Sequence, residues 1–126
     1  MADVIMIINA GLALISEALA ASASKYIAWG IGTTPPAAAN TALETASAEA
    51  RTAGTQTQQT TTTTDDTYQC AGTITCTASA KAITEVGIFD ASTAGDMYLR
   101  GTFSAINVGV GDSINFTIKT VYARVA

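Results

Sequence analysis

Apolar and polar residues alternate along much of the C-terminal half of the chain. Between Thr67 and Thr77 every second residue is apolar or small, and most of the residues between them are Thr. Successive side chains of a strand point to opposite faces, so a period of two predicts a strand that is buried on one face. We expect Tyr68, Cys70, Gly72, Ile74 and Cys76 to share that face.

Two further strands are predicted as a hairpin, over Ala82–Asp90 and Met97–Ala105. The segment between them, ASTAGD, is rich in turn residues and has a length typical of hairpin loops. The first strand carries apolar residues on both faces, which indicates that it is covered on two sides. In the second, Met97, Leu99 and Phe103 share a face. We expect Phe89 and Phe103 to be core anchors of adjacent strands.

A final strand is predicted over Ser113–Val125, after a turn at Asn107–Asp112. Its first apolar residues, Ile114, Phe116 and Ile118, fall on one parity, and Val121, Ala123 and Val125 fall on the other. This change predicts a β-bulge or a change of neighbour near Thr120. Asp90 and Asp112 are expected to begin turns by bonding their own backbone two residues on.

The N-terminal part has a different pattern. Val4–Ile8 is a short apolar run suited to a strand or a docking arm, and Asn9 is a plausible N-cap for a helix that ends near Ala20. Helical spacing gives this helix one apolar stripe, made of Leu12, Ile15 and Leu19. The run is too short for a membrane span and contains no basic residue before its apolar part, so we do not expect it to be a signal peptide.

The middle of the chain is predicted to contain one strand and much irregular structure. Lys25–Ile31 has strand character and ends before Pro35-Pro36, which cannot donate to a β-ladder. A helical turn could form within Thr41–Ala50. Arg51–Asp66 lacks any large apolar residue, so it is predicted to be a long hairpin arm or interface strand, or else a plain Thr/Gln loop.

The chain is therefore expected to be mainly β, as an antiparallel β-sandwich or barrel with one short N-terminal helix and extended arms. Its length of 126 residues fits a single domain over 1–126. Residues 1–24 would form the N-terminal arm and helix, and residues 51–66 the Thr-rich arm or loop.

Charge argues against two classes of partner. Charged residues are only 13% of the chain and the net charge is −4. Nucleic-acid binding needs a basic footprint, and anionic membranes repel an acidic protein, so neither partner is expected. A surface poor in charge and rich in hydroxyls is suited to a protein that remains in contact with others in an assembly.

Candidate chemistry is sparse. The chain has no His, the residue that most often performs acid–base catalysis, so we expect neither an enzyme nor a Cys/His metal site, and no cofactor. Cys70 and Cys76 lie on one predicted strand, about 20 Å apart at ~3.3 Å per residue, and should be free thiols.

The adjacent acids Asp65 and Asp66 are expected to be solvated, and the remaining acids, including Glu85, to lie around turns. The aromatic residues Trp29, Tyr68, Tyr98 and Tyr122 are expected to be core and interface anchors, although they could line a sugar-binding surface.

Two stretches resemble a known group of proteins. They are Lys25–Thr34, with the sequence KYIAWGIGTT followed by PPAAANTALET, and Ala82–Asp112, with the sequence AITEVGIFDASTAGDMYLRGTFSAINVGVGD. This layout is similar to that of small virion proteins of tailed bacteriophages, and the similarity covers most of the chain except Arg51–Asp66. Members of this group are capsid decoration (cement) proteins or tail-fibre components.

The resemblance implies a virion structural protein made in the host cytoplasm. The first hypothesis is a decoration protein on the outer capsid surface, a homotrimer whose partner is the major capsid protein. The alternative is a tail-fibre or baseplate module that binds a host surface receptor. Candidate interface residues lie in the two arms: Val4, Ile5, Ile7, Gln56, Gln58, Thr60 and Thr62. Deleting Gln56–Thr64 is expected to leave the fold intact and to weaken capsid binding.

Overall fold

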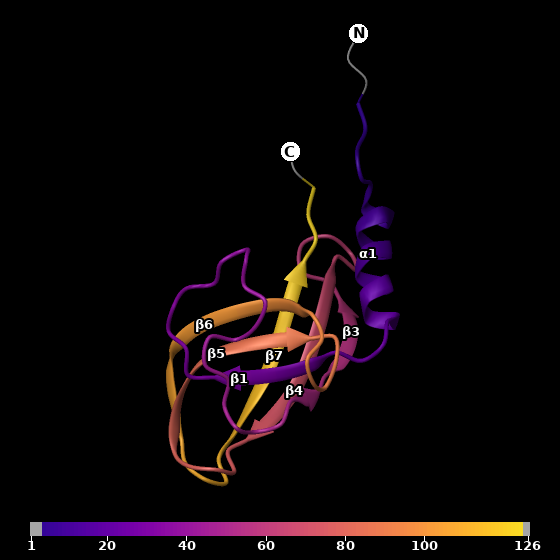
Figure 1. The fold of residues 1–126 in the computed structure, drawn as a ribbon. Coiled ribbons are helices and arrows are strands. Elements are labelled where there is room, and N and C mark those ends of the chain that lie inside the picture. The colour runs from indigo at the N-terminus through magenta and orange to yellow at the C-terminus, as the bar shows by residue number, and fades with distance from the viewer. Residues whose placement is uncertain (1–3, 125–126) are drawn as a thin grey trace.

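The computed structural model describes residues 4–124 as two antiparallel sheets with a helix beside one of them (Figure 1). One sheet has the strand order β2-β1-β5-β6 and the other has the order β3-β4-β7. The predicted sandwich with one short helix is confirmed. The elements are α1 (Asn9–Ala21), β1 (Tyr26–Gly30), β2 (Thr52–Ala53), β3 (Thr55–Gln59), β4 (Thr67–Thr75), β5 (Lys81–Phe89), β6 (Met97–Val108) and β7 (Ser113–Val121).

The main core lies between the two sheets. Ile27, Trp29 and Ile88 enter it from the first sheet, and Tyr68 and Cys70 enter it from the second. The alternation predicted for Thr67–Thr77 is confirmed, because its predicted inner face supplies buried residues while Thr73 and Thr75 are exposed. Both cysteines are free and buried, as predicted.

A second, smaller cluster covers the outer face of the first sheet. Ala28, Phe89 and Met97 meet Leu43 there, from the long loop that follows β1. β5 is thus buried on both faces, as its sequence predicted. Gly87 permits the close approach, because a Cβ at that position would lie 2.9 Å from Cδ2 of Leu43.

Met97 was predicted to share a face with Leu99 and Phe103, and this is wrong. Leu99 and Phe103 pack against the main core, whereas Met97 packs in the second cluster. The pairing of β5 with β6 shifts register between Ile88 and Phe89, opposite this end of β6. Such an irregularity changes which face the following side chains occupy.

The bulge predicted near Thr120 is also wrong. β7 pairs with β4 in one unbroken register, from Thr67↔Val121 to Thr75↔Ser113, and the strand ends at Val121. Beyond it, Tyr122 packs against the core. The change of parity in the sequence therefore marks the end of the strand. Val125 lies outside the described residues.

The Thr-rich segment is largely part of the sheets. β2 pairs with β1, and β3 pairs with β4 over five residue pairs from Thr55↔Ala71 to Gln59↔Thr67. β-branched Thr favours extended backbone, and an edge strand needs few large apolar side chains. The segment is thus neither a free hairpin arm nor a plain loop up to Gln59. The helical turn suggested within Thr41–Ala50 is not formed, and Ala46 makes a β-bridge with Gly30 instead.

Glu85 was expected near a turn, and this is wrong. It lies inside β5 with no exposed surface and forms an ion pair of 2.8 Å with Arg100 of β6. Its carboxylate also accepts hydrogen bonds from the backbone N–H groups of Gly32, Glu44 and Thr45, at 3.2, 3.1 and 2.8 Å. Arg100 donates further to the carbonyl of Thr34 and to Oδ1 of Asn40. This pair therefore holds the exposed Pro-Pro loop against the first sheet.

The turn roles expected of two aspartates also differ. Oδ1 of Asp90 accepts from the backbone N–H of Asp96, six residues on, and Oδ2 of Asp112 accepts from the N–H of Gly109, three residues back. Both carboxylates thus bridge the whole width of their turns. At the second turn, Gly111 has a φ of 95°, in the left-handed region that favours glycine.

Candidate assembly interface

The most exposed apolar segment described is the run before α1. Val4 is 82% exposed, Ile5 97%, and the next three residues, Met6, Ile7 and Ile8, are at least half exposed. The run is extended and projects from one end of the molecule, where the C-terminal tail also emerges (Figure 1). Burial of one such side chain stabilises a protein by about 1.5–3 kcal/mol, so five exposed in sequence form a candidate contact surface.

The apolar run is attached to a helix that packs by a different stripe from the one predicted. Leu12 is buried and Leu19 packs against the core, but Ile15 is 39% exposed and Ser16 is buried in its place. Leu14 is exposed too. The outward face of α1 therefore extends the exposed apolar surface of the run.

Asn9 does not have the predicted capping role. The N-cap is Ile8, and no side chain caps the helix. Oδ1 of Asn9 instead accepts a hydrogen bond of 2.7 Å from Arg124, which also donates to the carbonyl of Ile7 at 3.5 Å. Arg124 thus ties the C-terminal tail to the start of the helix.

Gln56 and Gln58 connect α1 to the second sheet. Nε2 of Gln58 donates to the carbonyl of Ala13 and to Oγ of Ser16, both at 2.8 Å. Nε2 of Gln56 donates to the carbonyl of Ser22 at 2.8 Å, and its Oε1 accepts from the hydroxyl of Tyr68 at 2.6 Å. Because these amides are occupied within the chain, their contribution is to place the helix.

The loop after β3 is organised by Asp66, which was expected to be solvated. Asp66 is buried, and its carboxylate accepts from the backbone N–H groups of Thr63, Thr62 and Thr61 and from the hydroxyl of Thr67. These hydrogen bonds, chiefly that from Thr63, hold the pKa of Asp66 well below its usual range. The loop therefore has one defined shape, which places Thr62 and Thr63 beside the N-terminal run.

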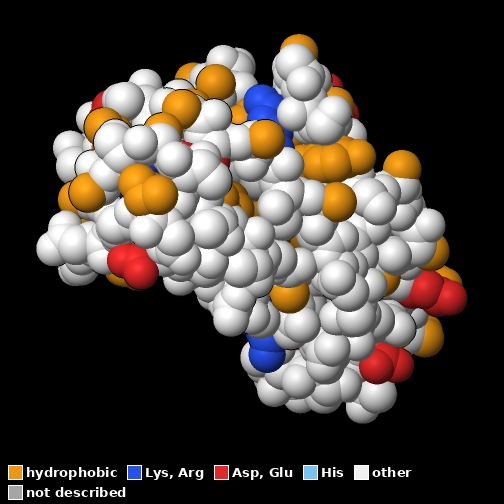
Figure 2. Space-filling view, turned by 90° about the horizontal axis from the view of Figure 1, so that it is seen from below, with side chains coloured by type: hydrophobic (Ala, Val, Ile, Leu, Met, Phe, Trp, Pro, Cys, Tyr) orange, Lys and Arg blue, Asp and Glu red, His pale blue; other side chains and the backbone are white. Residues whose placement is uncertain are grey.

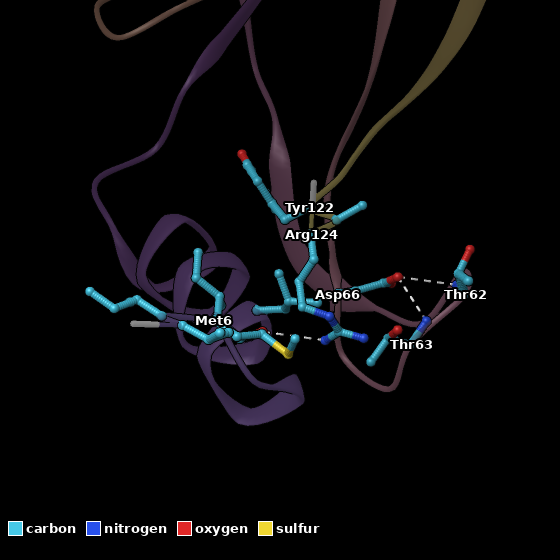
Figure 3. A pocket seen from close by; sticks show the side chains of 11 residues that line it. Met6, Thr62, Thr63, Asp66, Tyr122 and Arg124 are labelled. Atoms are coloured by element: carbon cyan, nitrogen blue, oxygen red, sulfur yellow. Dashed lines mark hydrogen bonds between the residues drawn. The ribbon is translucent and has the colours of Figure 1, made fainter. Parts of the chain in front are cut away.

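The run, the loop and the tail together enclose a groove of about 840 Å³ (Figure 3). Of the predicted interface residues, the structure brings Val4, Ile5, Ile7 and Thr62 together here. Gln56 and Gln58 are half-buried below it, and the hydroxyl of Thr60 accepts from the N–H of Asp65. The groove also includes Met6, Leu12, Thr63, Asp66 and the tail residues Tyr122, Ala123 and Arg124.

Sequence reasoning did not place the tail residues in this groove, although Tyr122 was expected to be a core or interface anchor. Tyr122 and Ala123 were assigned to the last strand, and nothing in their local pattern indicates that they face residues more than a hundred positions earlier. Arg124 carried one signal, because it is one of only six Lys and Arg residues in the chain.

Among residues 4–124, no three His, Cys, Asp or Glu side chains gather closely enough to hold a metal ion. In the same part of the chain, no helix has the length and hydropathy needed to cross a membrane. Trp29 and Tyr68 are buried in the core, whereas Tyr98 and Tyr122 bring their hydroxyls together at the surface.

The chain is a small β-sandwich with an exposed apolar run and few charged residues. Figure 2 shows one face of the molecule, on which acidic and basic side chains are few and widely separated. A family model described as "Podophage GP4 fiber I protein gp80" matches residues 7–124, nearly the whole chain, and the chain belongs to this family. It is therefore a virion-associated structural protein of a bacteriophage. No curated protein matches the chain significantly.

Proposed function

We propose that this chain is a structural subunit of a virion fibre, which assembles through the end that carries Val4–Ile8. The observation that carries this proposal is the exposure of five consecutive large apolar residues at the end where both termini emerge. The family's description as a fibre protein supports it. In this role the chain performs no catalysis and serves as a rigid β-sandwich within the fibre.

The fibre role is tested by counting and locating the chain on purified virions. Quantitative mass spectrometry should find far fewer copies of this chain than of the major capsid protein, and immunogold labelling should mark fibres. A copy number close to that of the major capsid protein, with label spread over the shell, would reject the fibre role.

A capsid decoration protein is the second candidate function. It is supported by the low charge of the surface, since only 13% of residues are charged and few appear on the face in Figure 2. In this role the chain would bind the major capsid protein on the outer surface, as a homotrimer that stabilises the shell by multivalent contacts. The same copy-number measurement separates the two functions.

A further inference from the structure

The two walls of the groove beside the N-terminal run come from different parts of the chain. One wall is formed by residues 4–7, and the other by Tyr122, Ala123 and Arg124 of the C-terminal tail (Figure 3). The Asp66 loop contributes Thr62 and Thr63 to the lining. Most of the lining is apolar.

The two charged groups of the groove make hydrogen bonds to neutral groups of the chain. The Asp66 carboxylate accepts four hydrogen bonds from its own loop and from Thr67, and the Arg124 guanidinium donates to Asn9 and Ile7. Most of the residues that line the groove are apolar, so an uncharged, apolar occupant buries the most surface there.

Residues 4–8, with the sequence VIMII, have the properties of such an occupant. The sequence contains no charged residue from Val4 to Ser16. The run is extended, and among the described residues the backbone groups of residues 4–6 have no hydrogen-bond partner. Extended segments of this kind bind by adding backbone hydrogen bonds to the contacts of alternate side chains.

The chain's own run is held away from the middle of the groove. The carbonyl of Ile8 accepts from the N–H groups of Gly11 and Leu12, and the carbonyl of Ile7 accepts from Arg124. These contacts fix the base of the run as one wall.

We propose that residues Val4–Ile8 of a second copy of this chain occupy the groove. The inference deepens the proposed function, since it names the partner of the same end of the molecule. Each copy carries one run and one groove, so reciprocal or cyclic exchange gives a closed assembly in which every run is covered.

The mass of the purified protein in solution tests this exchange. By light scattering, the wild-type chain should have a multiple of the 12.8 kDa monomer mass, and Ile5→Asp should return it to a monomer. Val110→Asp is the matched control, because Val110 is 66% exposed in the turn between β6 and β7 and should leave the assembly unchanged. Circular dichroism should show both variants folded. A monomeric wild type, or an Ile5→Asp variant that keeps its full assembly mass, would overturn the proposal.

Cross-linking between differently tagged copies tests the specific contact. Ile5→Cys in one copy and Ala123→Cys in the other should form a mixed disulfide, which must join two chains because each carries one added cysteine. Cys70 and Cys76 are buried and should remain unreacted. A mixture of Val110→Cys with Ala123→Cys is the control, and equal cross-linking there would overturn the contact. These measurements need no virion. They can therefore fail while the fibre location is confirmed, or succeed while the fibre location is rejected.

Discussion

The ion pair between Glu85 and Arg100 shows what a single buried residue contributes to this fold. Both side chains are almost completely buried, and Glu85 accepts three backbone hydrogen bonds in addition to that from Arg100. Burial alone would raise the pKa of Glu85, but the N–H of Thr45 and the Arg100 guanidinium hold the pKa below its usual value. The loop after β1 therefore takes its position from one carboxylate.

Replacing Glu85 by Gln should destabilise the protein by about 3–5 kcal/mol, because Arg100 is left as an uncompensated buried charge. Chemical denaturation measures this change in the free energy of unfolding. A second variant, Glu85→Gln with Arg100→Met, removes the charge and should recover part of the loss. A single variant as stable as the wild type would show that the pair contributes little.

The two phenylalanines predicted as core anchors should differ in their effect on stability. Phe89 is 3% exposed and also lies under the Arg51 guanidinium, whose carbon is 3.6 Å from the ring centroid. Phe103 is only half-buried, beside Phe116. Phe89→Ala should cost about 3–5 kcal/mol, and Phe103→Ala should cost less because less surface is lost. Equal denaturation midpoints for the two variants would contradict this order.

At the scale of elements, the attachment of α1 to β3 depends on polar contacts. The helix buries few large side chains, and Gln56 and Gln58 reach its backbone from the strand. The earlier expectation that Gln56–Thr64 can be deleted without loss of fold therefore changes. That deletion would remove most of an edge strand, the two glutamines and part of the Asp66 loop, so we now expect it to disturb the second sheet.

Gln58→Ala should weaken the docking of α1 by about 1–3 kcal/mol, since the variant removes two hydrogen bonds, to the Ala13 carbonyl and to Oγ of Ser16, each of which contributes roughly 0.5–1.5 kcal/mol. Hydrogen exchange should show faster exchange of the α1 amides, with the β5 amides unchanged. Gln59→Ala is the matched control, because within residues 4–124 the Gln59 amide bonds only to Thr57 of its own strand. Faster exchange in both variants would assign the effect to β3 itself.

The elements with a regular apolar pattern were the ones that the sequence allowed us to predict. Alternation in Thr67–Thr77 and the Gly-rich turns around β5 and β6 predicted three strands and their order along the chain. β3 carries Thr and Gln in place of large apolar residues, so its pattern could not separate an edge strand from a loop. Four of the eleven residues that line the groove, Val4, Ile5, Ile7 and Thr62, were predicted as interface residues, but contact with Ala123 depends on tertiary packing that local patterns do not contain.

At the scale of the whole molecule, three buried or bonded carboxylates make stability depend on pH. The pKa values of Glu49, Asp66 and Glu85 all lie below their ordinary range in the folded chain. For Glu49, burial opposes this shift, and the hydrogen bonds from Lys81, Thr77 and Trp29 produce it.

A carboxyl group with a lowered pKa stabilises the folded state fully above its unfolded pKa, which is roughly 4 for Asp and Glu. That stabilisation is lost as the pH falls through the folded pKa. We therefore expect the melting temperature to be nearly constant from pH 7 to about pH 5 and to fall progressively below it. Glu49→Gln should be less stable at pH 7 and should show a shallower decline in acid. Thermal scans measured across this pH range check both expectations.

Both termini emerge at one end of the sandwich, and the turn between β6 and β7 lies at the other (Figure 1). At this turn Val110 is exposed, whereas Gly111 is restricted to glycine by its positive φ. A change of the Val110 side chain alters neither the core nor the groove, so this position tolerates substitution. The same separation makes the turn a suitable place to insert a foreign peptide, which would then be displayed in as many copies as the assembly contains.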